Sequence, residues 1–179
     1  MSDFLTLSAD LESQPITGYL PDGRYINIPL VSHIVDNLYV GGYDFRAKFG
    51  DFFSHVFSLY KWESYGENEQ TGPDTIHTAW TMYDSRSGVQ VEDLAENPLT
   101  IEEVADEVVA ALEAGGNVLV HCQAGINRSN LTAAIVLMKW KGLTAAQAID
   151  MLREKRGPLV LANRTFENYL RRLDEVSTD

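Results

Sequence analysis

Apolar residues follow helical and strand-like spacings most clearly in the second half of the chain. Residues 101–112 are apolar at the positions that one face of a helix would bury, and Thr100-Ile101-Glu102-Glu103 has the spacing of a capping box. Residues 117–121 form a short apolar run of the kind buried in a parallel sheet. Start and stop signals predict three more helices, over residues 129–141, from Thr144 to Gly157, and from Asn163 to about Val176.

The first half of the chain has the composition of strands and turns. Short apolar segments predict strands at residues 34–40, 55–60 and 75–83. A stretch rich in Gly, Asn and Glu at residues 63–74 predicts a polar loop. Residues 1–31 predict an irregular lead-in with a short hairpin around Pro21-Asp22-Gly23.

This order of strands and helices predicts a single α/β domain over residues 32–179. A chain of 179 residues is long enough for one hydrophobic core and too short for two comfortable ones. The expected fold class is a central, mainly parallel sheet of about four to five strands flanked by helices.

The most informative segment joins the predicted strand at 117–121 to the predicted helix at 129–141. It reads His121-Cys122-Gln123-Ala124-Gly125-Ile126-Asn127-Arg128-Ser129. Successive backbone amides at a helix N-terminus can surround an anion, Gly125 permits close backbone approach, and the planar Arg128 side chain can hold two phosphate oxygens. These surroundings favour the thiolate of Cys122 over the thiol. We therefore predict a nucleophilic cysteine at the floor of an oxyanion-binding cup.

The segment resembles the signature of cysteine-dependent protein phosphatases, and within them the small dual-specificity group. The resemblance rests on His121-Cys122, the five residues before Arg128-Ser129, the strand ahead and the helix behind. It extends over residues 32–176 and includes Asn163-Arg164-Thr165-Phe166, which stands where such domains carry Asn-x-x-Phe. It implies a protein tyrosine phosphatase-like fold and leaves the first thirty residues unaccounted for.

The resemblance also implies hydrolysis of phosphomonoesters through a phosphocysteine. Cys122 would attack phosphorus, and Ser129 would help the thiolate to leave in the second step. The general acid would be an aspartate after a strand; Asp84, 38 positions before Cys122, fits best, and Asp93, 29 positions before it, is the alternative. The residues that would bind the phosphate are Gln123, Ala124, Gly125, Ile126, Asn127 and Arg128.

Simpler roles stay open for several of these residues. Asp84 could belong to a turn, Ser129 could be the N-cap of its helix, and Asn163 is expected to cap the last helix rather than contact substrate. His121 is expected to order the loop backbone rather than transfer protons. The other histidines have no metal-ligand spacing, so we predict no metal site and no cofactor.

Composition and charge narrow the classes of substrate and binding partner that we expect. The chain carries 14 Lys and Arg against 26 Asp and Glu, a formal net charge of −12, distributed as −4, −11 and +3 over residues 1–60, 61–116 and 117–179. A mean field of this sign disfavours RNA and anionic membranes. The phosphate-binding loop lies in the positive segment, so a phosphorylated protein or peptide is the expected substrate. Cys122 is the only cysteine, which excludes an intramolecular disulfide; with no signal-like or membrane-spanning run, a cytoplasmic location is expected.

Two rival functions stay in view. Asn127 directly before Arg128 is similar to the loops of RNA triphosphatases, which makes an RNA or nucleotide 5′-phosphatase the second candidate. A phosphate-binding interaction module without catalysis is the non-enzyme alternative, and the presence of Cys122, Arg128 and Asp84 disfavours it. The loop has no cation besides Arg128, which disfavours inositol lipids with several phosphates.

Overall fold

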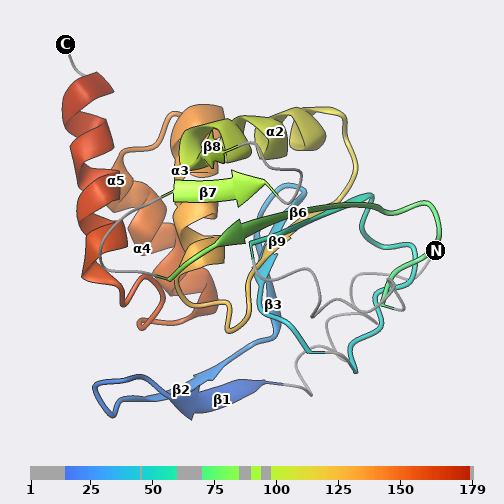
Figure 1. The fold of residues 1–179 in the computed structure, drawn as a ribbon, viewed down its shortest axis with the longest axis horizontal. Helices are drawn as coiled ribbons and strands as arrows, with labels where there is room; N and C mark the ends of the chain where they lie inside the picture. Colours follow the sequence, from blue (N-terminus) through green and yellow to red (C-terminus); the bar gives the residue numbers. More distant parts are fainter. Residues whose placement is uncertain (1–14, 45, 60–69, 85–89, 94–97, 178–179) are drawn as a thin grey trace.

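Four parallel strands form the centre of the molecule. The computed structural model describes residues 15–44, 46–59, 70–84, 90–93 and 98–177. Its main sheet has the order β3-β4-β9-β5-β6-β7-β8, and the strands from β4 to β6 in this order pair in parallel (Figure 1). The parallel strands are β4 (Leu38–Gly41), β9 (Val118–His121), β5 (His55–Ser58) and β6 (Ile76–Met82). The predicted central parallel sheet is confirmed.

Antiparallel strands extend the sheet at both edges. They are β3 (Val31–Val35) beside β4, and β7 (Gln90–Asp93) and β8 (Pro98–Thr100) beyond β6. The sequence pattern predicted neither β7 nor β8, because segments of three and four residues are too short to establish a period of two. With these edge strands, the sheet formed by the described residues has seven strands, more than the four to five expected.

The prediction of one strand over residues 34–40 is wrong, because the chain reverses within it. Asp36 takes a φ of 48° and joins β3 to β4 in a tight turn with Asn37. Asp and Asn tolerate this left-handed conformation better than other side chains. The side-chain Nδ2 of Asn37 donates to the carbonyls of Leu112 (3.0 Å) and Gly116 (2.6 Å), which holds the turn against the end of the helix α2 (Ile101–Glu113).

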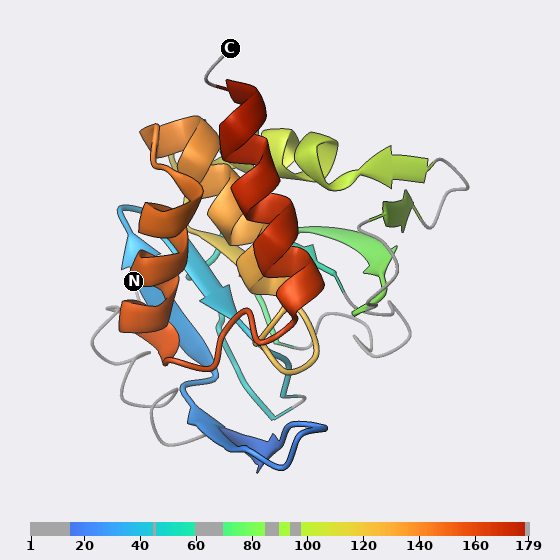
Figure 2. The same ribbon diagram turned by 90° about the vertical axis from the view of Figure 1, so that its left-hand side faces the viewer.

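The described residues form four helices near their predicted positions. These are α2 (Ile101–Glu113), α3 (Arg128–Lys141), α4 (Ala145–Arg156) and α5 (Arg164–Ser177). The capping boxes at Thr100 and Thr144 are present, and Gly142 ends α3 at a φ of 67°. Figures 1 and 2 show α3, α4 and α5 gathered on one side of the sheet. None of the described helices is long and apolar enough to span a membrane.

The two faces of the parallel strands bury different clusters. Val118 and Val120 of β9 face the helices, whereas Leu119 between them packs in a second cluster with Phe49 and Phe53. Because both faces are covered, β9 is buried at every position. The carboxyl ends of the parallel strands are thereby set in a rigid frame, and the loop after β9 starts from this frame.

The predicted N-terminal hairpin is confirmed. Strands β1 (Ile16–Tyr19) and β2 (Tyr25–Ile28) pair with Tyr19 opposite Tyr25. The hairpin lies apart from the main sheet, at the bottom of Figure 1. The side chains of Ile26 and Ile28 are buried against Ile126, which belongs to the loop after β9.

Some predicted segments lie outside the described residues. These are the first fourteen residues of the lead-in and most of the polar loop predicted at 63–74.

Candidate active site

The loop from Cys122 to Asn127 connects the end of β9 to the start of α3. In sheets of this kind, ligands bind beyond the carboxyl ends of the parallel strands. The amide of Cys122 donates to the carbonyl of Gly41 (3.3 Å), and the amide of Tyr43 donates to the carbonyl of Gln123 (2.9 Å). The beginning of the loop is therefore tied to the end of the neighbouring strand β4.

Three carbonyl groups of this loop accept hydrogen bonds from the surrounding protein. Besides Gln123, the carbonyl of Gly125 accepts from Asn130 Nδ2 (2.7 Å), and that of Ile126 accepts from Asn130 Nδ2 (3.0 Å) and from the amide of Leu161 (2.8 Å). In a planar trans peptide the N–H points opposite to the C=O. The amides that follow Gln123, Gly125 and Ile126 are consequently directed away from these partners and into the loop, as an anion cradle requires.

Arg156, the last residue of α4, donates hydrogen bonds to the loop and to residues on and beside the strands β3 and β4. Arg156 is 3% exposed, and its guanidinium donates to the Gly125 carbonyl through Nε (3.3 Å) and Nη2 (3.1 Å). It also donates to Ser32 Oγ (3.0 Å), to the carbonyl of Val40 (2.7 Å) and to that of Pro29 (3.3 Å). The five contacts join α4, β3, β4 and the loop at one buried point.

The charge of Arg156 also matters for the site. Burial lowers the pKa of Arg156 to about 10, and the negative charge of a Cys122 thiolate acts in the opposite direction. Arg156 is therefore protonated at neutral pH and places a buried positive charge near the sulfur. Sequence reasoning missed this residue, because a Lys- and Arg-rich helix end is ordinarily a solvated surface.

Gly125 is required for both its conformation and its size. Its φ is 69°, and a Cβ atom there would lie 2.6 Å from Arg156 Nη2 and 2.7 Å from the backbone nitrogen of Gly42. A side chain would therefore displace the guanidinium that holds the loop. The predicted close backbone approach at Gly125 is present, although its partners are protein groups.

Cys122 and Ser129 meet at the floor of the loop. Cys122 is 1% exposed, and its thiol donates a hydrogen bond to Ser129 Oγ, with 3.4 Å between sulfur and oxygen. The alternative in which Ser129 is the helix N-cap is wrong, because α3 begins at Arg128 and its N-cap residue is Asn127. The hydroxyl of Ser129 is therefore directed to the sulfur.

Arg128 is oriented by two strand ends. Its Nη1 donates to the carbonyl of Met82 (3.1 Å), at the end of β6, and to that of Leu59 (3.4 Å), after β5. These contacts place the guanidinium at the carboxyl edge of the sheet, where the loop begins.

Asp84 is held against the loop by two amide side chains. Asn127 Nδ2 donates to Asp84 Oδ2 (2.8 Å), and Asn163 Nδ2 donates to Asp84 Oδ1 (2.7 Å). Asp84 itself is exposed. Asn127 makes no side-chain cap on α3, so its amide serves Asp84 instead. Asp93, on β7, lies opposite Trp80 of β6. Trp80 comes before the carboxyl end of β6, whereas Asp84 comes after it.

Asn163 combines two roles, of which the sequence predicted one. Its Oδ1 accepts from the amide of Thr165 (3.0 Å), which caps α5 as expected. Its backbone amide donates to Asn127 Oδ1 (3.0 Å) while its side chain reaches Asp84. Sequence reasoning could not find the second role, since it depends on residues 36 and 79 positions away.

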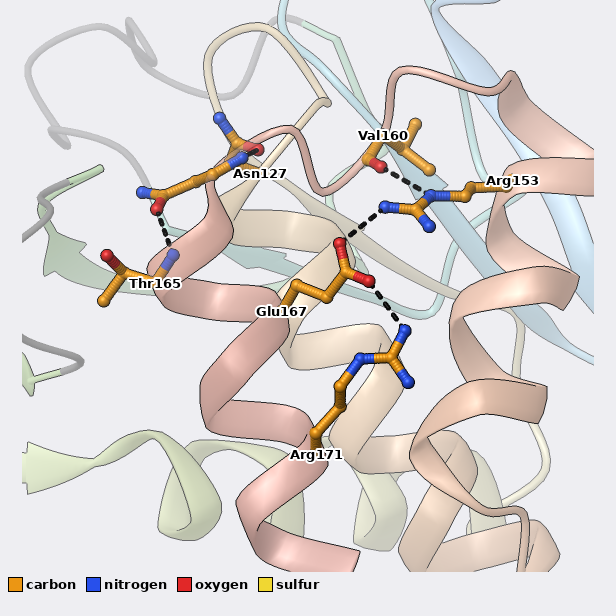
Figure 3. Close-up of polar contacts among 7 residues, drawn as sticks. Asn127, Arg153, Val160, Thr165, Glu167 and Arg171 are labelled. Atoms are coloured by element: carbon orange, nitrogen blue, oxygen red, sulfur yellow. Dashed lines mark hydrogen bonds and ion pairs between the residues drawn. The ribbon is translucent and has the colours of Figure 1, made fainter.

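An ion-pair cluster fixes the start of α5 beside the loop (Figure 3). Arg153 bonds the carbonyl of Val160 (3.2 Å) and pairs with Glu167 (2.9 Å), which also pairs with Arg171 (2.7 Å). Both arginines hold the pKa of Glu167 below its usual value, with the Arg171 hydrogen bond as the largest cause. The segment that carries Asn163 is thus tied to α4 and α5 on either side.

His121 is buried as a neutral side chain. Burial lowers its pKa to about 4 from an ordinary value of 6.5, although a hydrogen bond with the Cys122 backbone acts in the opposite direction. Its ring stacks on that of Tyr43 with centroids 6.3 Å apart. A neutral imidazole contacting the backbone agrees with the expectation that His121 orders the loop.

Among the described residues, no group of three or more His, Cys, Asp or Glu side chains could hold a metal ion. The groups assembled at this site are instead a buried thiol, two guanidinium groups, inward amides and one carboxylate. Together they can bind an oxyanion beside a nucleophile and an acid.

Comparison with known proteins defines the family. Residues 71–175 match the family described as "Dual specificity phosphatase, catalytic domain". Dual specificity protein phosphatase 1 of Arabidopsis thaliana is 36% identical over 89 residues, covering 49% of this chain and 44% of the relative. Dual specificity protein phosphatase 26 of Homo sapiens is 34% identical over 90 residues, covering 49% of this chain and 42% of the relative. The match thus spans less than half the length of either relative.

Solved structures show the same fold. The crystal structure of human DUSP28 superposes with a TM-score of 0.63 at 20% sequence identity, covering 84% of this chain and 97% of that one. The chain belongs to the dual specificity phosphatase catalytic domain family, whose members are cysteine-dependent phosphatases. The resemblance inferred from the sequence is confirmed.

We predict that Arg156→Met impairs both the site and the stability of the fold. The substitution keeps the buried volume but removes the donors to Gly125, so turnover of p-nitrophenyl phosphate should fall at least about tenfold. The free energy of unfolding, measured in urea, should fall by about 2 kcal/mol because buried carbonyls lose their partners. Lys155→Met, on the exposed face of α4, is the control and should change neither quantity appreciably. Wild-type turnover in Arg156→Met would contradict this role.

We predict that buried His121 makes stability fall in mild acid. The unfolded chain takes up this proton near pH 6.5 and the folded one only near pH 4, so the unfolded state binds more protons between these values. The free energy of unfolding should therefore decrease as pH falls through this window, by up to about 3 kcal/mol from His121. His55 and His77, whose pKa values burial also lowers, act in the same direction.

Urea unfolding between about pH 7 and pH 5 measures this dependence. His121→Gln should lose the larger part of it, whereas His33→Gln, at an exposed position, should keep it. Equal pH dependence in both variants would show that another group is responsible.

Proposed function

We propose that this protein hydrolyses phosphomonoesters on proteins, with phosphotyrosine and also phosphoserine or phosphothreonine as candidate substrates, through a phosphocysteine intermediate. The observation that carries the proposal is that Asp84 is bonded to Asn127 of the same loop that holds Cys122 against Ser129. Nucleophile, oxyanion cradle and acid thus belong to one connected unit.

In the first step, the thiolate of Cys122 attacks phosphorus and the bond from phosphorus to the leaving oxygen breaks. Asp84, in its protonated form, gives its proton to that oxygen. The inward amides of the loop and Arg128 bind the three other phosphate oxygens, on which charge accumulates. The buried positive charge of Arg156 favours the thiolate from behind the loop.

In the second step, the carboxylate of Asp84 takes a proton from water, whose oxygen attacks phosphorus. The sulfur–phosphorus bond breaks, and Cys122 leaves as a thiolate. Ser129, which lies 3.4 Å from the sulfur, donates its hydroxyl hydrogen to the departing thiolate. The phosphate product carries the oxygen from water, and the enzyme returns to its starting state.

The contacts of Asn127 bear on whether the substrate is a phosphorylated protein or an RNA or nucleotide 5′-phosphate. The resemblance to RNA triphosphatases rested on this residue, but its side chain is bonded to Asp84 and to the Asn163 amide. A role inside the protein therefore accounts for Asn127 without a nucleotide. The overall charge of −12 also disfavours a polyanionic chain such as RNA.

The connected catalytic groups also weigh against a non-catalytic phosphate-binding module. Such a module needs the cradle and a cation, but it does not need a thiol paired with a hydroxyl or an aspartate bonded to the loop. In this chain Cys122, Ser129 and Asp84 occupy those positions.

We expect Cys122→Ser to reduce hydrolysis of p-nitrophenyl phosphate to background, because a hydroxyl at that position is a far weaker nucleophile than a thiolate. Wild-type protein quenched in acid during turnover should carry phosphate on Cys122, detected by mass spectrometry. A metal chelator should not change the wild-type rate. Full activity in Cys122→Ser would refute the mechanism.

We expect Asp84→Asn to lower turnover of a phosphotyrosine peptide roughly 10²–10⁴-fold, since the leaving oxygen would depart without a proton. The dependence of turnover on pH should be flatter in the variant than in the wild type, because the proposed proton donor is absent. Asp93→Asn is the matched control and should keep both the rate and the pH profile. The reverse pattern would assign the acid to Asp93.

A further inference from the structure

A groove of about 630 Å³ lies where the start of α2, the end of α3, the start of α4 and the end of α5 meet. We call it the helix-end groove; its apolar lining consists of Ile135 and Met138 on α3, Leu143 after α3, and Leu173 on α5. Figures 1 and 2 show the C-terminal end of α5 on the side of the molecule away from the β1–β2 hairpin. The 14 residues of α3 run from the phosphate-binding loop to this groove and span about 20 Å. The helix-end groove is therefore separate from the active site.

The apolar side chains of the groove are only partly covered. Met138, Leu143 and Leu173 are half-buried and pack against the main core cluster, to which Ile135 belongs. The space that they border is within the roughly 300–1,000 Å³ of typical ligand pockets. Methionine is flexible and polarizable, and is common at surfaces that bind varied peptides. The groove can therefore accept apolar side chains of a binding partner.

Carboxylates dominate the charge of the groove. Glu102, Asp174 and Glu175 line it. Lys139 is the one Lys or Arg among the described residues of the lining. It pairs with Asp106, with 2.6 Å between Nζ and Oδ1, and donates to the carbonyl of Glu102 (3.1 Å). The lining therefore carries an excess of negative charge.

The helix ends at the groove act in the same direction. The last turn of α5 contains Asp174 and Glu175 and no Lys or Arg, so no basic side chain of that turn offsets the partial negative charge of the helix end. At the starts of α2 and α4, capping boxes at Thr100 and Thr144 occupy first-turn amides. The amide of Ala145 donates to Asp174 Oδ2 (2.7 Å). These helix starts offer few donors to an anion, so the groove favours a cation.

Charge complementarity distinguishes between three possible occupants of the groove. Residues 1–14 contain Asp3, Asp10 and Glu12 and no Lys or Arg, so repulsion between like charges disfavours this segment of the chain itself. A second copy of the chain would bring a formal net charge of −12 to an acidic surface. A segment that carries Lys or Arg beside apolar side chains matches both the carboxylates and the apolar lining.

We propose that the helix-end groove binds a segment of a partner protein in which apolar side chains are flanked by Lys or Arg. The apolar side chains of this segment lie against Met138, Leu143 and Leu173. Its cations lie beside the carboxylates of the lining. Because the groove is at the far end of α3, the bound segment leaves the phosphate-binding loop accessible, and the partner is held by a contact that does not involve a phosphate.

Selection from a phage-displayed library of random short peptides identifies the sequences that this groove prefers. The full chain is immobilised as wild type, as Met138→Gln and as Glu175→Lys. Sequences that are enriched on the wild type and lost on both variants should carry Lys or Arg on either side of Leu, Ile, Met or Phe. Val176→Gln and Glu113→Lys are matched controls that should enrich the same sequences as the wild type, because both positions are exposed and neither lines the groove.

The enriched peptide, synthesised with a fluorescent label, gives a Kd by fluorescence anisotropy. Met138→Gln should raise this Kd about tenfold, because a buried methionine contributes at least that much to an apolar contact. Glu175→Lys should raise it about three- to tenfold, because attraction at an exposed position becomes repulsion. The two controls should stay within about twofold of wild type. Added salt should weaken the binding, because it screens the charges.

Several results would overturn the proposal. They are the absence of any enriched sequence, enrichment that is equal on wild type and both groove variants, and groove-dependent sequences that are acidic or uncharged. A wild-type dimer in sedimentation that both groove variants dissociate would make a second copy of the chain the occupant instead. If Met138→Gln loses folded structure by circular dichroism, Glu175→Lys, at an exposed position, decides the comparison alone.

The groove and the proposed phosphatase function can fail independently. Turnover of p-nitrophenyl phosphate, measured in the same preparations, should be equal in wild type, groove variants and controls, because the groove lies about 20 Å from the loop. Loss of peptide binding with intact turnover therefore concerns the groove alone. Peptide binding without any turnover in the wild type would contradict the proposed function and leave the groove in place.

Discussion

The site depends on where one carbonyl group points. The oxygen of Gly125 accepts hydrogen bonds from Asn130 and from two nitrogens of Arg156, all from the outer side of the loop. Because a peptide unit is planar, this turns the following amide into the loop, where an anion can bind. Arg156 can reach this oxygen only because Gly125 has no side chain and a positive φ. The inward direction of this amide therefore depends on Arg156, and the contact of Arg156 depends on glycine at position 125.

A single side chain, that of Asn127, likewise connects the phosphate-binding loop to the proposed acid, Asp84. Asn127 ends the loop and precedes the first residue of α3, where its side chain could have capped the helix. Its amide instead bonds Asp84, while its oxygen accepts from the backbone of Asn163. The first turn of α3 therefore keeps its amides available for a phosphate. One asparagine connects the loop, the end of β6 and the start of α5.

Much of this arrangement could be predicted from the sequence, and the exceptions share a physical cause. Helix ends, the parallel core and the loop from Cys122 to Arg128 follow local rules of spacing and capping, so the pattern indicated them. The reversal at Asp36 was missed because apolar residues continue on both sides of it. Arg156 and the second role of Asn163 were missed because each acts on residues more than thirty positions away. Local sequence patterns do not show which distant residues will contact one another in the fold.

The charges around the loop show most clearly that the composition of the chain does not predict the charge at one site. A formal charge of −12 averages over the whole chain, whereas two guanidinium groups stand beside the loop and one of them is buried where water cannot screen it. On the hairpin of β1 and β2 the opposite happens, because Asp22 pairs with Arg24 and offsets its charge. The charge that an anion meets at the loop is therefore set by individual pairings and by burial, and not by the net charge of the chain.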